Sequence, residues 1–467
     1  MPDLEDLRRD AREIFGDALA AVDARRAVLD AVEVEGTRLR VCDAEFDLRV
    51  RKIYSVAVGK AAAAMASALD GRLGDRLARG VLSATPSNAP LSARWRVFAG
   101  GHPLPNGASL EAARAAFELL RKADGPSSLI LFLVSGGGSA MIEWPRDPRV
   151  ALEDLREANR VLVSCGAGID EVNAVRRALS AVKGGGLCAR VPRAAQVTLV
   201  VSDVAAGREY DVASGPTLTP HGDARAVREV VERYGLASKL PASVLQALEE
   251  ADARQTQGAP SNTVPGTAPS DAPTEDAPSD SLRKHYVLLD NARACAAAAE
   301  SARRRGFAVE SAHDLSEQNV GDGAAALVSR LAELHRREGA GGRGVCLISG
   351  GEFACPVRGA GVGGRNSETA LRCAFEFEKM CDGDGPGWTP RAAVALSAGT
   401  DGVDGNSPAA GALADHTTLC RSRGRGLDAT EFLEESNAYS FFERLGDAVI
   451  TGPTGTNVRD VRILFAR

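Results

Sequence analysis

The sequence has few aromatic residues, no paired-cysteine motif and no long apolar run. Only 4% of its 467 residues are aromatic, so its cores must be packed mainly with alanine, valine and leucine. None of its nine cysteines forms a CxxC pair, a pattern typical of reduced thiols inside a cell. No apolar stretch reaches the ~18 residues that a membrane span needs, and no secretory signal follows the first methionine. We therefore expect a cytoplasmic protein that does not bind membranes.

Basic character is also missing, whereas glycine is abundant. The formal net charge is −6 at pH 7, which argues against nucleic acid as a partner. The 49 glycines must serve turns and places where the backbone approaches other groups closely. A chain of this length exceeds one hydrophobic core, so two or three domains are expected.

Residues 252–282 have a composition unlike the rest of the chain. They contain five prolines and one large apolar residue, Val264, before Leu282. Such a stretch cannot bury enough surface to offset the entropy lost on ordering. It is predicted to be a disordered insertion or linker that separates a domain of residues 1–251 from a domain of residues 283–467.

Both predicted domains alternate short apolar runs with amphipathic helical patterns. Runs that are apolar on both faces and are separated by helices indicate buried parallel strands, so two α/β domains are expected. The runs cover 54–59, 128–136, 196–203, 285–291, 344–351, 392–399 and 462–466.

Four of these runs end in serine followed by small or acidic residues. Ligands of open α/β sheets bind beyond the carboxyl ends of the strands, so such loops suit the rim of a site. Tight turns use the same residue types and are the alternative. Two such loops in each half favour a cleft between the domains. The four segments are VSGGG (134–138), VSDVA (201–205), ISGGE (348–352) and LSAGTDG (396–402).

Lys60 and the segment SGGGS (135–139) are candidates for anion binding. Lys60 follows a predicted strand and opens an alanine-rich helix, where a cation opposes the macrodipole at a cost of roughly 0.3–1 kcal/mol. A bound anion would explain that position, and an exposed lysine is the alternative. The consecutive glycines offer unobstructed backbone N–H groups that suit phosphate or carboxylate oxygens. The segment is not a P-loop, because no Lys-Ser/Thr pair follows at the required spacing.

The segment RGAGVGGRNSETAL (358–371) contains a G-x-G-x-x-G pattern. It does not follow a hydrophobic strand, so dinucleotide binding is discounted. We predict instead a loop that delivers Arg365 to a helix start, with Asn366 or Ser367 as the N-cap. Arginine there could clamp a phosphate or carboxylate, and a surface pair with Glu368 is the alternative.

Polar strand-end loops supply further candidates. Asp401 and Asp404 of GTDGVDG, with Asp203 as the counterpart in the first half, suit Mg²⁺ or a substrate hydroxyl, although turns also favour aspartate. The loop TGPTGTNVRD (451–460) could line a pocket or simply turn a corner. His102 lies alone between glycine and proline and is predicted to be structural or solvated.

Taken together, these motifs resemble the glycerate 2-kinases that carry a MOFRL C-terminal domain. The resemblance covers nearly the whole chain apart from 252–282. It implies ATP- and Mg²⁺-dependent phosphorylation of D-glycerate to 2-phosphoglycerate. It also implies a Rossmann-like N-terminal domain with a mostly parallel sheet, a smaller α/β C-terminal domain, and an active site in the cleft between them. The matching motifs, in chain order, are AVGKAA, GGHPLPNG, SGGGSAM, VRRALSAVKGGGLCA, SDVAAGREYDVASGPT, SGGE, GGRNSE, GTDGVDG and TGPTGTNVRD.

The chain departs from the family pattern at three places. Ala206 and Gly207 stand where the family usually has an acidic Gly-Asp pair, and Pro408 stands where it commonly has another acid. Three glycines follow Lys183, where many bacterial members have Lys-Gly-Gly-Arg. The first two departures remove carboxylates that could bind a metal.

These considerations give a full set of predicted site residues and partners. Lys60, Arg365 and Asp203 are the predicted catalytic residues, and Asp203 and Asp401 the predicted Mg²⁺ ligands. The expected partners are D-glycerate and ATP, with a homodimer left open. The alternatives are a hydroxypyruvate reductase and a catalytically impaired regulator that binds a nucleotide or metabolite. The predicted substrate- or nucleotide-binding residues are Ser135, Gly136, Gly137, Gly138, Ser139, Asn366, Thr400, Asp401, Thr454 and Asn457.

Overall fold

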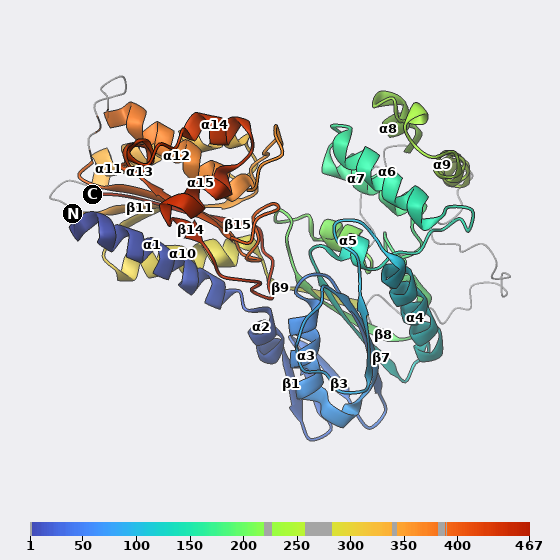
Figure 1. The fold of residues 1–467 in the computed structure, drawn as a ribbon. Helices are drawn as coiled ribbons and strands as arrows, with labels where there is room; N and C mark the ends of the chain where they lie inside the picture. Colours follow the sequence, from blue (N-terminus) through green and yellow to red (C-terminus); the bar gives the residue numbers. More distant parts are fainter. Residues whose placement is uncertain (1, 219–226, 257–282, 339–342, 382–387, 389) are drawn as a thin grey trace. The chain divides into compact units, whose positions relative to one another are not determined.

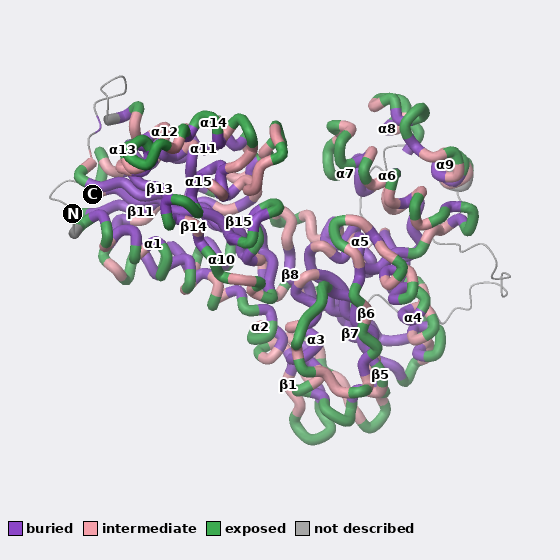
Figure 2. The backbone as a smooth tube through the Cα atoms, in the orientation of Figure 1, coloured by how far each residue is buried: buried purple, intermediate pink, exposed green. Residues whose placement is uncertain are grey.

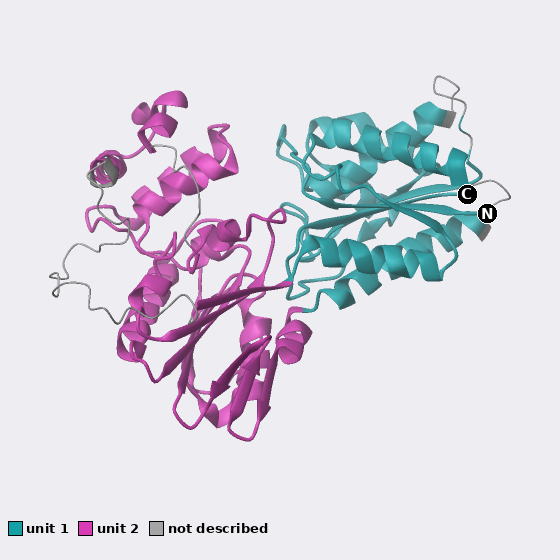
Figure 3. Cartoon of the chain, turned by 180° about the vertical axis from the view of Figure 1, so that it is seen from behind, with its two compact units in different colours: residues 1–23, 289–467 teal, residues 24–288 magenta. Residues whose placement is uncertain are grey.

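The computed structural model describes residues 2–218, 227–256, 283–338, 343–381, 388 and 390–467. The chain forms two compact units (Figure 3). Residues 24–288 make one, here called the N-terminal unit, and residues 1–23 with 289–467 make the other, the C-terminal unit. The chain therefore passes from one unit to the other twice.

The N-terminal unit contains a six-stranded sheet in the order β6-β5-β4-β7-β8-β9 (Figure 1). The pairs β4–β5, β4–β7, β5–β6 and β7–β8 are all parallel. Every residue of β7 and β8 is buried, as expected for central strands covered on both faces (Figure 2). The strands are β4 Lys52–Val58, β5 Leu77–Ala84, β6 Trp95–Ala99, β7 Ser128–Ser135, β8 Ala195–Val201 and β9 Arg283–Leu289.

Helices and a small hairpin sheet complete the N-terminal unit. A separate antiparallel sheet consists of β1 Val32–Glu35, β2 Arg38–Val41 and β3 Ala44–Asp47. Helices α6 to α9 contribute to a hydrophobic core of their own. The helices are α2 Ala24–Ala31, α3 Ala62–Leu73, α4 Gly107–Ala123, α5 Gly138–Met141, α6 Leu152–Ser164, α7 Ile169–Leu179, α8 Val227–Arg233 and α9 Ala242–Thr256.

The C-terminal unit contains a second six-stranded sheet, in the order β10-β11-β15-β12-β13-β14. Within this sheet only β10 and β11 pair in parallel, and β15 runs antiparallel to both β11 and β12. The pairs β12–β13 and β13–β14 are antiparallel as well. The prediction of parallel strands is therefore wrong for most of this sheet. An apolar run reports cover on both faces and not strand direction. The strands are β10 Ala308–Ser311, β11 Val345–Gly351, β12 Ala393–Gly399, β13 Gly411–Asp415, β14 Ala448–Val449 and β15 Asp460–Ala466.

Helices cover both faces of this second sheet. In Figure 1, α1 and α10 lie along one face, and α11 and α12 lie along the other. The two-unit α/β architecture expected from the sequence is confirmed. The helices are α1 Pro2–Ala21, α10 Asn291–Arg304, α11 Val320–Glu338, α12 Arg365–Cys381, α13 Thr418–Gly424, α14 Ala429–Glu434 and α15 Ala438–Leu445.

The two units differ from the predicted boundaries at both ends of the N-terminal unit. Helix α1 belongs to the C-terminal unit, where the buried Arg8 pairs with Asp415 and Asp447. Strand β9, expected in the second half, instead extends the first sheet. An amphipathic pattern says that a segment packs on a core without saying on which one.

Part of the predicted insertion can be located. Helix α9 extends to Thr256, so residues 252–256 are helical and not disordered. Residues 257–282 lie outside the described residues, so their predicted disorder stays a prediction. Within the described residues, no helix is long and apolar enough to cross a membrane.

Candidate active site

Three strand ends meet at the glycine loop Gly136–Gly138 of the N-terminal unit. Strands β4, β7 and β8 are parallel neighbours, so their carboxyl ends share one edge of the sheet. The Lys60 N–H donates to the Gly136 carbonyl at 2.8 Å. The next N–H, of Ala61, donates to Ser135 Oγ at 3.0 Å. The turn that carries Lys60 is thus fixed directly to the glycine loop. Lys60 does not open the helix as expected, because α3 begins at Ala62 and Lys60 lies in the turn before it.

The glycines leave the space that neighbouring side chains occupy. A Cβ added to Gly136 would lie 1.8 Å from Asp203 Oδ2. A Cβ added to Gly137, whose φ is +78°, would lie 3.0 Å from Lys60 Cγ and 3.1 Å from His102 Cδ2. The loop therefore needs glycine because an ammonium side chain, a carboxylate and an imidazole pack onto its backbone. The structure brings together Lys60, Asp203 and the loop, as predicted, and adds His102.

The two serines that flank the glycines have protein partners. Ser135 is buried and accepts the N–H of Ala61. Ser139 Oγ lies 2.8 Å from Ser214 Oγ, and Ser214 bonds in turn to Asn173 Oδ1 at 3.1 Å. Ser214 has a φ of +60°, a strained conformation that costs on the order of 1–3 kcal/mol. These serines therefore hold the loop in place.

A buried ion pair lies next in the chain to the backbone that bonds to Ser214. Lys183, 2% exposed, pairs with Glu143, which also accepts from Ser180 Oγ at 2.5 Å. Burial lowers the pKa of Lys183, against the opposing effect of Glu143. The Gly184 N–H, next in the chain, donates to the Ser214 carbonyl at 3.1 Å. The Lys-Gly-Gly-Gly segment thus supports the backbone that holds Ser139.

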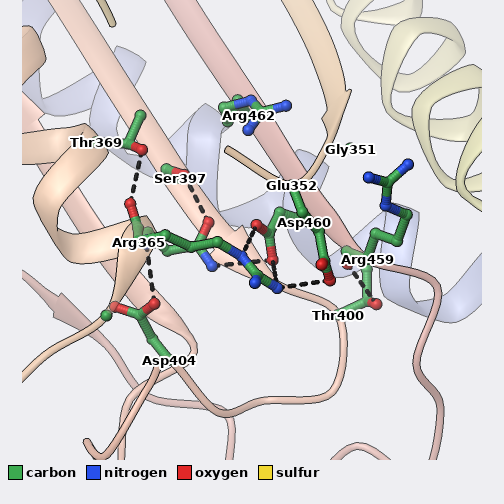
Figure 4. A network of polar contacts seen from close by, with 12 residues as sticks. Gly351, Glu352, Arg365, Thr369, Ser397, Thr400, Asp404, Arg459, Asp460 and Arg462 are labelled. Carbon is green, nitrogen blue, oxygen red and sulfur yellow. Dashed lines mark hydrogen bonds and ion pairs between the residues drawn. The ribbon is translucent and has the colours of Figure 1, made fainter. Parts of the chain in front are cut away.

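In the C-terminal unit, Arg365 is the first residue of α12 and lies between two carboxylates (Figure 4). Its Nε donates to Asp460 Oδ2 at 2.6 Å, and its Nη2 donates to Glu352 Oε1 at 2.6 Å. Burial opposes the charge of Arg365, but Asp460 and Glu352 outweigh it and raise its pKa above the ordinary value. Because β15 is antiparallel to β11 and β12, its first residue, Asp460, lies where those strands end.

The alternative surface pair of Arg365 with Glu368 does not occur. Glu368 is buried and pairs with Arg358 and Arg372. Glu368 therefore does not compete for Arg365, whose side chain bonds to Asp460 and Glu352 at the edge of the sheet.

A distant carboxylate caps α12. Asp404 Oδ1 accepts the N–H of Asn366 at 2.9 Å, while its Oδ2 accepts the N–H and the hydroxyl of Ser367 at 2.8 and 2.6 Å. Asp404 is 1% exposed, and burial is the main reason that its pKa is raised to about 6. The prediction of Asn366 or Ser367 as the N-cap is wrong, because the helix already begins at Arg365 and Asp404 supplies the acceptor.

Asn366 is fully engaged by the protein. Its Nδ2 donates to Asp460 Oδ1 at 3.0 Å, and its Oδ1 accepts from Ser397 Oγ at 2.7 Å. This arrangement fixes the carboxylate that holds Arg365, so the geometry gives Asn366 a positioning role.

The remaining predicted residues connect two loops of the same unit. Thr400 is buried, and its hydroxyl donates to the Arg459 carbonyl at 2.7 Å and accepts the Val458 N–H at 2.8 Å. Thr454 Oγ1 donates to the Thr400 carbonyl at 2.5 Å. These contacts hold the loop before β15 against the loop after β12.

Asp401 and Asn457 also contact backbone groups of these loops. Asp401 Oδ1 accepts the N–H of Val403 at 3.1 Å. Asn457 Oδ1 accepts the N–H of Arg459 at 3.4 Å. The structure thus gathers Arg365, Asn366, Thr400, Asp401, Thr454 and Asn457 around the ends of β11 and β12, and Lys60, Ser135 to Ser139 and Asp203 in the N-terminal unit.

The predicted metal ligands do not form a cage. Asp203 and Asp401 belong to different units, and the described part of the chain holds no group of three or more His, Cys, Asp or Glu residues able to bind a metal ion. Single carboxylates nevertheless fit Mg²⁺, which is commonly held by one or two of them together with substrate phosphates.

Sequence reasoning missed several residues of these sites. Glu352 and Asp460 were not singled out as partners of Arg365, and Asp404 was assigned no capping role. Glu352 follows the glycines of a strand-end motif, which is a local signal. Asp460 becomes visible only once the direction of β15 is known. The sequence predicts His102 to be structural or solvated, because a lone histidine in a loop is more often so than catalytic.

Strand-end loops with glycines, a lysine and a clamped arginine are typical of α/β proteins that bind small anionic ligands. Residues 10–249 match a family model described as a domain of unknown function (DUF4147), and residues 345–460 match the MOFRL family. The glycerate 2-kinase of Pyrococcus horikoshii is 32% identical over 98% of this chain and 97% of its own. Human glycerate kinase is 33% identical over 99% and 93%.

A solved structure agrees with these relatives. The crystal structure of glycerate kinase from Thermotoga maritima superposes with a TM-score of 0.76 at 28% identity, over 99% of this chain and all of that one. The chain belongs to the glycerate kinase family.

Proposed function

We propose that this protein transfers the γ-phosphoryl group of ATP to the 2-hydroxyl of D-glycerate. The observation that carries the proposal is the anchored Lys60 on its glycine loop, in a chain that matches glycerate kinases over nearly its full length. The second group of residues, around Arg365, is assigned to the same reaction.

Phosphoryl transfer requires positioning and charge neutralisation more than covalent chemistry. Lys60 and Arg365 supply positive charge to the transferring phosphoryl group or to the carboxylate of glycerate. Arg365 is oriented in advance by Asp460, which is 2% exposed, while its other partner, Glu352, is 34% exposed. Glu352 is therefore the partner that a ligand displaces, and Asp460 keeps the guanidinium in position.

The glycine loop supplies neutral donors to the same reaction. Backbone N–H groups of Gly136 to Gly138 would hold an anionic group of glycerate or of the nucleotide. Thr454 and Asn457 lie on a polar loop at the edge of the second sheet and are proposed to contact substrate or nucleotide. Thr400 contributes by fixing that loop.

Mg²⁺ would neutralise charge on the phosphates, with Asp203 and Asp401 as its proposed ligands. Asp203 is held against the backbone of Gly136, so its carboxylate is fixed beside the proposed anion site. The family carboxylates that are replaced by Ala206, Gly207 and Pro408 are not required if the nucleotide supplies most of the ligands.

The decisive experiment is NMR of the reaction product. Purified protein with ATP, D-glycerate and MgCl₂ should release ADP and yield 2-phosphoglycerate. Failure to release ADP would refute the proposal, and 3-phosphoglycerate as the product would refute the assigned position.

The two alternative functions are separated by simple assays. A hydroxypyruvate reductase oxidises NADH or NADPH, but the G-x-G-x-x-G pattern at 359–364 follows a loop and not a strand, contrary to a dinucleotide-binding turn. A regulator would bind nucleotide or glycerate with no turnover.

A further inference from the structure

We infer that His102 contacts the reacting hydroxyl of D-glycerate and accepts its proton. This inference rests on the proposed function and deepens it by assigning the group that recognises the hydroxyl. The sequence alone gives His102 no partner, and the structure places it at the glycine loop beside Lys60.

The position of the imidazole carries the inference. A Cβ at Gly137 would lie 3.1 Å from His102 Cδ2, 3.3 Å from its Nε2 and 3.0 Å from Lys60 Cγ. The stem of the lysine and the edge of the imidazole therefore pack over one α-carbon. A substrate held by the loop and by Lys60 lies within reach of this ring.

The loop that carries His102 is tied down on both sides. Its first glycine, Gly100, approaches the Met141 carbonyl so closely that a Cβ there would lie 2.4 Å from the oxygen. The Gly101 N–H donates to Ser109 Oγ at 3.0 Å, and Asn106 caps α4. Because Met141 ends the short helix that follows the glycine loop, the two loops are held as neighbours.

The exposure of His102 is a further observation in favour of substrate contact. His102 is exposed, although its loop is well anchored. A rigid loop that presents an exposed imidazole beside an anion site is suited to substrate contact.

The chemistry also favours the imidazole over its neighbour Asp203. A carboxylate that binds Mg²⁺ is a weak proton acceptor, whereas imidazole is the side chain that most often serves as a general base. As the hydroxyl oxygen bonds to the γ-phosphorus, its proton passes to Nε2 of His102. The bond from phosphorus to the bridging oxygen breaks, and its electron pair leaves with ADP.

Two inhibitors that each lack one hydroxyl test the contact. D-Lactate keeps the 2-hydroxyl and lacks the 3-hydroxyl, and 3-hydroxypropanoate has the opposite pattern. In His102→Ala, inhibition by D-lactate should weaken about tenfold, while inhibition by 3-hydroxypropanoate stays within about twofold. The kcat for D-glycerate should fall about 10²–10⁴-fold with a smaller change in KM.

The controls separate this inference from folding and from the proposed function. His102→Asn provides a second variant if alanine disturbs the loop, and His313→Ala, an exposed histidine of the C-terminal unit, should leave all constants unchanged. Equal weakening of both inhibitors, or no weakening of either, overturns the contact. A large kcat loss in Asp203→Asn with none in the His102 variants assigns the proton to Asp203 instead. Wild-type protein that makes no phosphoglycerate refutes the proposed function itself, whatever the inhibitors show.

Discussion

The two units build their candidate sites from different materials. In the N-terminal unit the candidate site is built on the backbone of three glycines, and Lys60, Asp203 and His102 pack against that backbone. In the C-terminal unit one arginine is fixed by a network of carboxylates and an amide. Glycine substitutions in the first site should act through lost space, and substitutions in the second site through unpaired buried charge.

The largest effect is expected at the centre of the side-chain network. Arg365→Ala should lower kcat by about 10³-fold or more, because it removes a positioned cation and leaves Asp460 buried without its partner. Arg365→Lys should recover little, since an ammonium group cannot bind two carboxylates in a planar fork. Arg372→Ala, in the same helix but paired with Glu368, is the matched control. Steady-state kinetics measure all three, and an Arg365→Ala variant near wild-type rate would remove this residue from the site.

Lys60, the cation of the N-terminal site, should be nearly as important for activity as Arg365. Lys60→Ala is expected to lower kcat/KM about 10²–10³-fold, because one charge at the developing anion is lost. Its thermal unfolding should hardly change, since the turn is held by the backbone bond to Gly136. Near-normal turnover in this variant would show that Lys60 does not bind an anionic group in the reaction.

An added methyl group tests whether the N-terminal site is limited by space. Gly136→Ala would place its Cβ 1.8 Å from the Asp203 carboxylate, so Asp203 must move and kcat/KM should fall about 10²-fold. Gly107→Ala has open space at the start of α4 and should keep full activity. If both variants behave alike in kinetics and in calorimetry, the glycine loop has no steric role.

The smallest effect is expected for the remote cap of α12. Asp404→Asn should lower kcat/KM about tenfold by loosening the first turn that carries Arg365. Asp415→Asn provides the control, because Asp415 is an equally buried carboxylate that bonds to Thr417 before α13, away from Arg365. Loss of activity in both variants to the same degree would reduce the role of Asp404 to general stability.

The pH dependence of stability offers a second measurement on Asp404. Its folded pKa of about 6 lies above the ordinary value of 3.8, so the folded state holds this proton more tightly than the unfolded state does. This contribution is fully present below about pH 4 and is lost as the pH rises through 6, which amounts to roughly 3 kcal/mol. Denaturant unfolding of wild type between pH 4 and 7 should show this decline relative to Asp404→Asn.

The same contrast explains what could be predicted from the sequence. The glycine loop and Lys60 are local features, because the strand, the turn and the helix start are adjacent in the chain. The partners of Arg365 are not local: Asp460 lies 95 residues away and reaches the site only because β15 enters the sheet antiparallel between β11 and β12. No periodicity of apolar residues encodes that direction.

The assignment of segments to units failed for a related reason. Helix α1 and strand β9 have ordinary amphipathic and apolar patterns, and either would fit either core. Buried contacts such as Arg8 with Asp415 and Asp447 decide the matter, and they span more than 400 residues. The sequence therefore predicted the class of fold and most of its elements. It did not predict that α1 packs in the C-terminal unit or that β9 extends the sheet of the N-terminal unit.

Because α1 precedes the N-terminal unit in the chain but packs in the C-terminal unit, the N-terminal unit is inserted into the sequence of the C-terminal unit. A protease cut within residues 257–282 would leave one fragment with α1 but not the rest of its own unit, and a second fragment with β9 but not the rest of the first sheet. Each fragment would hold a piece that the other needs to complete a core. We therefore expect the nicked protein to remain a single particle, and the two fragments to fold properly only when they are produced together.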